Sequence, residues 1–287
     1  MSRRRACLVV PAAPAAKLAK GATLAADEVV LDLEDAVVPA LKDEARGAVS
    51  EALAGAWAAE SVAVRVNAIG SPWCHLDLAA VAASARDALT VVLPKVEHTD
   101  DLAFADRLLA GAEAAAGRTT PVRLLALIET AGGLAAAAEI ARASERLDGL
   151  VLGYADLAAS FGRTGGASQD WRFAQESLLV AARAAGIQAI DGPHLATRDD
   201  AAFRAGVMHA RALGFDGKWA IHPAQLDAMR EAFTPTEDEI ADAREVLAEL
   251  ERAAADGAGA VAAGDRMLDE AIALSARRVL ARADAGR

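Results

Sequence analysis

The stretch that decides the fold reads Leu124-Leu125-Ala126-Leu127-Ile128-Glu129-Thr130, and it is followed by Leu150-Val151-Leu152-Gly153-Tyr154-Ala155-Asp156. Each segment is a short apolar run that leads into a carboxylate, and the pattern between them, over residues 132–144, is typical of a helix. Near-continuous apolar runs indicate parallel strands that are buried on both faces. Functional side chains gather at the carboxyl ends of such strands. We therefore expect Glu129 and Asp156 to lie together at one edge or mouth of a parallel sheet.

Two acids on neighbouring strands form the protein half of a site for a hard cation. Magnesium takes oxygen ligands and needs only one or two protein carboxylates, because substrate and water oxygens complete its shell. A single acid at such a position is more often a helix N-cap or a surface charge. The position and pairing of Glu129 and Asp156 favour a metal site over that reading.

Eight short apolar segments alternate with alanine-rich helical patterns along the chain. Alanine is a strong helix former, and residues 77–86 place Leu78, Val81, Ala82 and Ala85 on one helical face. Repeated strand–helix units with right-handed crossovers produce a parallel sheet, and eight of them suggest a closed α/β barrel. A doubly wound open sheet is the alternative, since periodicity alone does not separate the two. The predicted strands cover residues 6–11, 29–34, 62–67, 90–96, 122–129, 148–154, 187–191 and 218–222.

Beyond the eighth strand the pattern changes. Residues 256–260 are predicted to form a glycine-rich loop between helices. We expect a barrel domain over residues 1–232 and a C-terminal helical extension, serving as a lid, over residues 233–287. The helices predicted in this part cover residues 224–232, 236–255 and 268–284.

Composition and charge narrow the class of protein. The 287 residues suffice for one α/β barrel, which takes about 250 residues. Hydrophobic residues make up 54% and charged residues 25%, as in globular proteins. The net charge of −11 argues against nucleic acid as a partner, and no apolar run approaches the roughly 20 residues of a membrane span. Cys7 and Cys74 form no disulfide framework, so we expect a cytoplasmic protein.

The predicted strand ends carry a high density of polar side chains. Besides Glu129 and Asp156, these residues are Glu34, Asp35, Arg65, Asn67, Lys95, Asp191 and His222. In a barrel they would all converge on one mouth. Cations such as Arg65 and Lys95 beside several acids are expected to bind and order an acidic, metal-bound substrate.

Some strand-end residues have ordinary explanations. We interpret Asn67 and Asp191 as polar residues that appear where a buried strand meets solvent, and His222 as a structural hydrogen-bonding residue. Gly132-Gly133 either lets backbone N–H groups approach an anion or simply relieves crowding. The sequence lacks HExxH, a Walker A loop, GxSxG and GxGxxG, which argues against zinc hydrolysis, P-loop phosphate binding and serine hydrolysis.

A series of short motifs, taken in order, resembles a known family. The motifs are Val30-Leu31-Asp32-Leu33-Glu34-Asp35-Ala36-Val37, Val64-Arg65-Val66-Asn67, Leu93-Pro94-Lys95, Leu127-Ile128-Glu129-Thr130, Gly153-Tyr154-Ala155-Asp156-Leu157, Ile190-Asp191-Gly192-Pro193 and Gly217-Lys218-Trp219-Ala220-Ile221-His222-Pro223-Ala224-Gln225. The chain resembles the citrate lyase beta-subunit-like (CitE-like) branch of the HpcH/HpaI aldolase/citrate lyase family. Its pattern is closest to that of the malyl-CoA and citramalyl-CoA lyases. The resemblance covers nearly the whole chain.

The resemblance implies a fold, a cofactor and a reaction. It implies a TIM barrel, a magnesium ion, and cleavage of a 3-hydroxyacyl-CoA of the citramalyl-CoA or malyl-CoA type to acetyl-CoA and a 2-keto acid. By matching motifs, Glu129 and Asp156 bind the metal, and Arg65 contacts the substrate carboxylate and the reacting oxygen. Glu34 and Asp35 would not bind the metal directly but would hydrogen-bond to water molecules that are bound to it.

The tail gains a meaning from the same family. Gly259-Ala260-Val261 followed by Arg266-Met267-Leu268-Asp269 resembles the C-terminal lid of acyl-CoA lyases, where an aspartate reaches an active site. That site commonly belongs to the neighbouring subunit of a trimer. The match implies that Asp269 is the acid/base catalyst and that the protein is a homotrimer or a dimer of trimers. The alternative is that Asp269 only caps the last helix.

Other functions are compatible with the same predicted site. A metal-dependent aldolase acting on free hydroxy-keto acids would need neither CoA nor a lid. A citrate lyase beta subunit would act on an acyl-carrier-protein thioester within a larger complex. A malyl-CoA thioesterase and a scaffold without activity are further alternatives. The long tail with Met267, Leu268 and Asp269 favours the CoA lyase over the first two.

Overall fold

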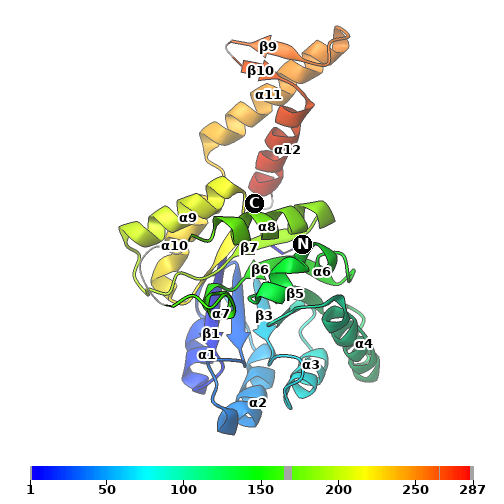
Figure 1. The fold of residues 1–287 in the computed structure, drawn as a ribbon, viewed down its shortest axis with the longest axis vertical. Helices are drawn as coiled ribbons and strands as arrows, with labels where there is room; N and C mark the ends of the chain where they lie inside the picture. The colour runs from blue at the N-terminus through cyan, green and yellow to red at the C-terminus, as the bar shows by residue number, and fades with distance from the viewer. Residues whose placement is uncertain (1, 165–169, 265, 285–287) are drawn as a thin grey trace. The chain divides into compact units, whose positions relative to one another are not determined.

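Eight parallel strands close into a barrel in the computed structural model, which describes residues 2–164, 170–264 and 266–284. Each strand pairs with its neighbours in sequence, and β1 also pairs with β8 (Figure 1). The strands are β1 (Ala6–Pro11), β2 (Glu28–Asp32), β3 (Ser61–Arg65), β4 (Leu89–Leu93), β5 (Arg123–Ile128), β6 (Leu147–Leu152), β7 (Gln188–Asp191) and β8 (Gly217–Ala220). This closure confirms the predicted TIM barrel and excludes the open sheet. Several strands end earlier than predicted, so some of the polar residues lie in the loops that follow.

The helices lie around the barrel (Figure 1). They are α1 (Ala15–Ala22), α2 (Lys42–Leu53), α3 (Cys74–Ala82), α4 (Thr99–Ala116), α5 (Ala131–Ala135), α6 (Ala137–Ile140), α7 (Tyr154–Ser160), α8 (Arg172–Ala185), α9 (Ala201–Leu213) and α10 (Leu226–Phe233). The single helix predicted over residues 132–144 is in fact two short helices. At its start a Cβ on Gly133 would lie 2.2 Å from the carbonyl oxygen of Val96. Gly133 therefore relieves crowding, which is one of the two roles predicted for the glycine pair.

Alternation along the strands fills the barrel interior and also positions the site. The buried interior cluster comprises Cys7, Val30, Ala63, Val92, Leu125, Leu127, Val151, Ile190 and Trp219. Side chains on one face of a strand recur every second residue. Asp32, Arg65 and Glu129 each lie two residues beyond a member of this cluster. The pattern that builds the apolar core therefore delivers three charged side chains to the carboxyl end of the barrel.

A buried arginine closes the amino end of the barrel. Arg4 is 1% exposed, and its guanidinium donates to Glu28 Oε1 at 2.9 Å, Gln188 Oε1 at 2.7 Å and Thr90 Oγ1 at 3.0 Å. A Cβ on Gly217 would lie 1.8 Å from the Arg4 carbonyl oxygen, so only glycine fits there. A charge so fully buried is tolerated because it is paired and hydrogen-bonded.

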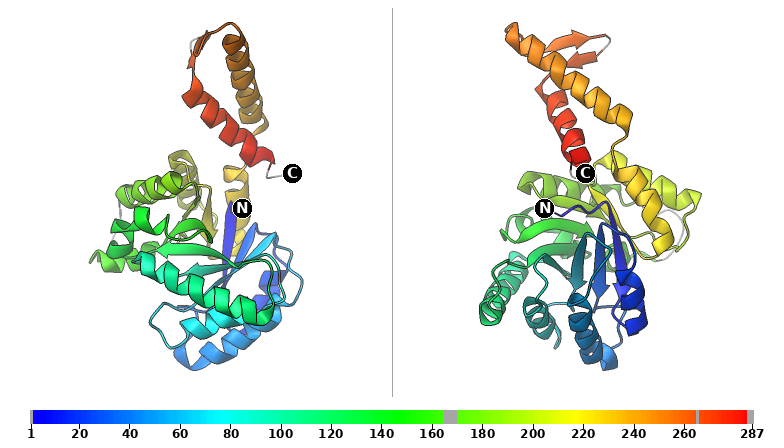
Figure 2. Two further views of the ribbon diagram at one scale, coloured as in Figure 1. Left: turned by 90° about the vertical axis from the view of Figure 1, so that its right-hand side faces the viewer. Right: turned by 180° about the vertical axis from the view of Figure 1, so that it is seen from behind.

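The chain divides into two compact units, Met1–Met229 and Arg230–Arg287. The elements of the second unit beyond α10 are α11 (Glu237–Ala255), β9 (Val261–Ala263), β10 (Arg266–Leu268) and α12 (Glu270–Asp284). The two helices lie side by side, and the antiparallel hairpin β9–β10 joins them (Figure 2). Leu268 packs with residues of both helices in a small core. The hairpin was not predicted, because each strand has only three residues.

The cysteines and the hydrophobicity of the helices were also considered in the sequence. Both Cys7 and Cys74 are free and buried. None of the helices described is long and apolar enough to cross a membrane.

Arg4→Met tests the closure of the barrel at its amino end. We expect this change to lower the free energy of unfolding by about 3–5 kcal/mol, because it leaves Glu28 buried without its charge partner. Urea unfolding measures the effect. The control is Arg172→Met, which removes an exposed pair with Glu176 and should cost less than about 1 kcal/mol. Equal losses in both variants would contradict this account.

Candidate active site

Glu129 is a carboxylate buried at the mouth of the barrel. It follows β5 directly and is 2% exposed, and its Oε1 accepts a hydrogen bond of 2.9 Å from the backbone N–H of Lys95. A Cβ on Gly153 would lie 2.6 Å from both the Cβ and Oε2 of Glu129. Gly153, between β6 and α7, therefore leaves the space that the Glu129 side chain occupies.

The surroundings of Glu129 oppose its negative charge. Burial raises the pKa of Glu129 to about 8, and the charges of Glu34 and Asp156 add to this effect, while Lys95 and Arg65 counteract it. Removing a carboxylate from water and placing further acids beside it both favour the protonated form. A metal cation bound beside Glu129 would instead favour its ionised form.

Asp156 lies in the first turn of α7. Its side chain is 36% exposed, and its Oδ1 is 3.6 Å from Lys95 Nζ. The predicted pair of acids is therefore asymmetric. Glu129 is buried beneath the mouth, whereas Asp156 is accessible to ligands from solvent.

The ammonium group of Lys95 lies between several of the acidic side chains at the barrel mouth. Its Nζ donates to Glu34 Oε1 at 2.5 Å and lies 3.8 Å from Asp35 Oδ1, in addition to its contact with Asp156. Its backbone has φ of 53°, a left-handed conformation that costs a residue with a Cβ about 1–2 kcal/mol. That conformation accompanies the N–H bond to Glu129, so one strained residue contacts four acids. Strain of this kind gathers at functional sites.

Arg65 is oriented by an acid that sequence reasoning missed. Asp32, which is 1% exposed, accepts from Arg65 Nε at 2.8 Å and from Nη2 at 2.7 Å. The remaining Nη1 lies 3.1 Å from Glu34 Oε2. Burial alone would lower the pKa of Arg65, but its hydrogen bonds and charge contacts with Asp32 raise it above the ordinary value. The alternation of β2 could have revealed Asp32, since it lies two residues beyond Val30.

The loop that carries Glu34 is held by Lys42, which sequence reasoning also missed. Lys42 Nζ donates to the carbonyl oxygens of Leu33 at 2.7 Å and Glu34 at 2.6 Å. Glu34 is 5% exposed, and burial raises its pKa against the opposing effect of Arg65. Asp35 is much more exposed, at 58% of its side chain. A lysine on a helix gives no sign in sequence that it will bind backbone carbonyls.

Asn67 and Asp191 were both predicted to lie where a strand meets solvent, and both predictions are wrong. Asn67 is 3% exposed, and its Nδ2 donates to Asp77 Oδ2 at 2.7 Å. Asp191 is 1% exposed at the end of β7, where it forms a close ion pair with Lys218 of β8. The hydroxyl of Tyr154 donates to its other carboxylate oxygen. Burial, together with the charge of Asp191, raises the pKa of Tyr154 well above its ordinary range. The strand-end position predicted Asp191's location, but nothing in the sequence paired it with Lys218.

Asp269 belongs to the second unit and is exposed. Its Oδ1 accepts hydrogen bonds from the backbone N–H groups of Ala271 at 3.0 Å and Ile272 at 3.1 Å. It therefore caps α12, as the alternative interpretation required. Capping uses one carboxylate oxygen, so a role in proton transfer stays a prediction.

The acids at the mouth suit a hard cation that also binds substrate. Among residues 2–164, 170–264 and 266–284, no three or more His, Cys, Asp or Glu side chains are arranged to hold a metal ion. The pair Glu129 and Asp156 is consistent with magnesium, which needs only one or two protein carboxylates. The buried, charge-opposed Glu129 is the donor that a cation would stabilise most.

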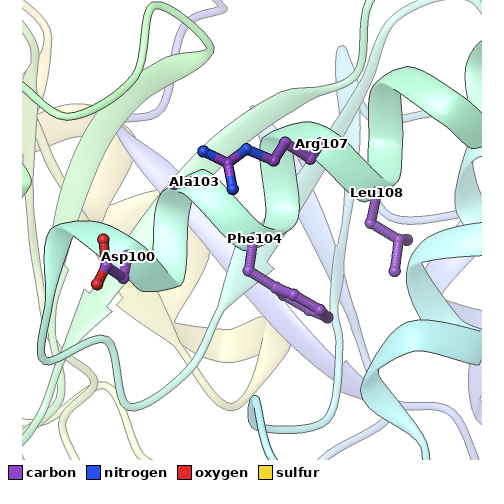
Figure 3. A pocket seen from close by; sticks show the side chains of 5 residues that line it. All are labelled: Asp100, Ala103, Phe104, Arg107 and Leu108. Carbon is purple, nitrogen blue, oxygen red and sulfur yellow. The ribbon is translucent and has the colours of Figure 1, made fainter.

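A separate pocket lies on the outside of α4 (Figure 3). Its lining residues all come from this one helix and share no member with the barrel mouth. They are Asp100, Ala103, Phe104, Arg107 and Leu108. Its position gives it no part in the arrangement of acids described above.

Residues 5–223 match the family model for HpcH/HpaI aldolase/citrate lyase. The chain belongs to this family. A "L-malyl-CoA/beta-methylmalyl-CoA lyase" of Cereibacter sphaeroides is 36% identical over 98% of this chain and 94% of its own length. The "Citrate lyase subunit beta" of Escherichia coli is 39% identical over 98% of this chain and 93% of its own length. The chain is accordingly a carbon–carbon lyase, which confirms the predicted reaction type.

The family also includes similar solved structures. CitE of Mycobacterium tuberculosis in complex with magnesium, acetoacetate and coenzyme A has a TM-score of 0.79 and 34% identity, covering 99% of both chains. The citrate lyase beta subunit of the same organism complexed with oxaloacetate and magnesium has a TM-score of 0.68 and 34% identity, covering 82% of this chain and 98% of its own. These neighbours confirm the predicted CitE-like branch.

Glu129→Gln tests the electrostatics of the mouth. A carboxyl group with a raised pKa in the folded state binds more protons when folded than when unfolded, so its contribution to stability is lost as pH rises from about 4.5 to about 8. In urea unfolding with a chelator, the unsubstituted protein should lose up to about 1.4 kcal/mol per pH unit relative to Glu129→Gln within this window.

The control for this titration is Glu113→Gln. Burial would raise the pKa of Glu113, but hydrogen bonds from Arg146 lower it, so its stabilisation is lost only as pH falls below about 4.5. No pH-dependent difference is expected for this variant between about pH 5 and 8. A difference for Glu129→Gln that stays constant with pH would contradict the raised pKa.

Proposed function

We propose that this protein is a magnesium-dependent lyase that cleaves a 3-hydroxyacyl-CoA of the citramalyl-CoA or malyl-CoA type to acetyl-CoA and a 2-keto acid. The observation that carries the proposal is the pairing of buried Glu129 with accessible Asp156, beside Arg65, at the barrel mouth. The CoA lyase relative and the CitE structure with magnesium and coenzyme A support the thioester substrate.

Glu129 and Asp156 would hold the metal, with Glu34 and Asp35 acting behind them. When bound, magnesium supplies a Lewis acid that stabilises negative charge on a substrate oxygen. Lys95 holds Glu34 and Asp156 in place and can contribute a positive charge to an acidic substrate. The mixture of charges suits a substrate that carries a carboxylate next to its hydroxyl group.

Arg65 and Asp269 would have different tasks. The hydroxyl group of the substrate gives its proton to solvent water, its oxygen becomes the carbonyl oxygen of the 2-keto acid, and the electron pair of the broken carbon–carbon bond passes to the acetyl-CoA enolate. Arg65, fixed by Asp32, can stabilise the negative charge that develops during this step. Asp269 would donate a proton to the enolate carbon, and in reverse would deprotonate acetyl-CoA. We propose that it serves a neighbouring subunit's site in a homotrimer or a dimer of trimers.

A substrate panel tests the proposal. With magnesium present, the full chain is assayed on malyl-CoA, citramalyl-CoA, hydroxymethylglutaryl-CoA and free hydroxy-keto acids, and acetyl-CoA, free CoA and keto acid are all measured. We expect both products to be released from malyl-CoA or citramalyl-CoA. Free CoA without keto acid would indicate a thioesterase, and activity only on free acids would indicate an aldolase; either result would overturn the proposal.

One of the relatives is a citrate lyase beta subunit, so the assay must also distinguish a CoA thioester from an acyl-carrier-protein thioester. The panel therefore includes one acyl group presented on both CoA and acyl-carrier protein. We expect turnover on CoA. Turnover on the carrier protein alone would identify a citrate lyase beta subunit instead.

Asp269→Asn tests the proposed acid/base residue. Asparagine caps a helix about as well as aspartate does, so folding of α12 should be preserved. We expect magnesium affinity to stay unchanged while turnover falls roughly 10²–10⁴-fold, the usual contribution of general acid/base catalysis.

The matched control for Asp269→Asn is Asp256→Asn, which removes an exposed charge at the end of α11 in the same unit. It should leave turnover unchanged. If Asp269→Asn has the turnover of the unsubstituted protein, Asp269 only caps α12 and is not the acid/base catalyst.

A further inference from the structure

Tyr154, Asp191 and Lys218 form a further polar group in the barrel, in which Asp191 is buried and Tyr154 is half-buried. Lys218 is 4% exposed, and besides its ion pair with Asp191 it donates to the Gly192 carbonyl oxygen at 2.5 Å. The Tyr154 hydroxyl donates to Asp191 and accepts a hydrogen bond of 2.7 Å from Gln175 Nε2. The phenol therefore uses both its donor and its acceptor capacity. None of these side chains has a role in the proposed reaction.

The ring of Tyr154 is also closely packed. A Cβ on Gly192 would lie 2.8 Å from Tyr154 Cδ2 and 3.0 Å from Cε2, so the backbone packs closely against one side of the ring. The ring of Trp171 lies 5.2 Å away, measured between centroids. Such packing leaves the side chain little freedom to move independently of β7 and the segment after it.

Tyr154 is also the first residue of α7, whose first turn carries Asp156. This short helix has no side-chain cap at Gly153, although the Gly153 N–H continues the barrel ladder by donating to the Ile128 carbonyl at 3.0 Å. Leu157 of the same turn is completely buried, and Tyr154 adds a hydrogen bond that links the turn through Asp191 to the neighbouring strands β7 and β8. Asp156 follows Tyr154 by two residues.

We propose that Tyr154 is a positioning residue for the metal ligand Asp156, which it places by fastening the start of α7 to the buried Asp191–Lys218 ion pair. The inference rests on the proposed function in taking Asp156 as a ligand. Partners that orient metal ligands typically contribute 10–100-fold to metal affinity. Tyr154 fastens the helix rather than the carboxylate itself, so we expect an effect of about tenfold.

Tyr154→Phe keeps the ring and removes the hydroxyl group. By isothermal titration of the full chain with Mg²⁺, we expect roughly tenfold weaker binding, and we expect excess Mg²⁺ to restore turnover toward that of the unsubstituted protein. The matched control is Thr90→Val, which removes a buried hydroxyl group that Arg4 contacts at the amino end of the barrel. It should destabilise the fold without changing Mg²⁺ affinity.

A spectroscopic signal provides a readout that does not depend on activity. Tyr154 is the only tyrosine in the chain, so incorporated 3-fluorotyrosine gives a single ¹⁹F resonance. We expect this resonance to shift as Mg²⁺ saturates the site.

Two results would overturn the inference while leaving the proposed function intact. One is a Tyr154→Phe protein that binds Mg²⁺ within twofold of the unsubstituted affinity, together with a ¹⁹F resonance that does not shift when Mg²⁺ binds to the labelled protein that keeps Tyr154. The other is equal weakening by Tyr154→Phe and Thr90→Val, which would reflect general destabilisation. If the unsubstituted protein binds no Mg²⁺, the proposed function fails and this inference falls with it.

Discussion

The site depends on one unfavourable arrangement, a carboxylate buried among other acids. Glu129 is almost fully removed from water, and Glu34 and Asp156 add negative charge around it. Such a group tends to take up a proton unless cations compensate for its charge. The basic residues around Glu129 provide this compensating charge. Lys95 adopts a strained backbone and contacts several acids, and Arg65 is held in place by a further buried acid.

The barrel uses buried charge differently at its two ends. At the amino end, Arg4 has its donors matched to Glu28, Gln188 and Thr90, so that end contributes to folding and has no evident chemical role. At the carboxyl end, Glu129 is left with a raised pKa and an exposed partner acid. Carboxylates whose pKa is strongly shifted by burial and neighbouring charges gather at functional sites. The contrast within one barrel supports placing the chemistry at the carboxyl end.

Period-two alternation along the strands puts Arg65 and Glu129 on the interior face of the barrel. The sequence predicted eight apolar strands that alternate with helices, but it was the resemblance to the family that favoured a closed barrel over an open sheet. The sequence also placed Glu34, Lys95 and Asp156 at the strand ends. It could not reveal side-chain contacts that depend on the path of a loop or on which strands pair. Lys42 is only eight residues from Glu34, but its bonds depend on the path of the loop between them, and Lys218 meets Asp191 because β8 pairs with β7. Asp32 lies two residues beyond Val30 on the same face of β2, so the alternation of that strand could have predicted that it points into the barrel. The role of Asp269 rests on the family motif, since locally it is a helix cap.

Calorimetric titration of the full chain with Mg²⁺ shows whether the acids at the barrel mouth hold one magnesium ion. Two variants are titrated alongside, Asp156→Asn at the mouth and Asp148→Asn at the other end of the barrel. We expect one ion bound per chain, binding lost in Asp156→Asn, and binding retained in Asp148→Asn. Undiminished binding in Asp156→Asn, or no binding by the unsubstituted chain, would contradict this expectation.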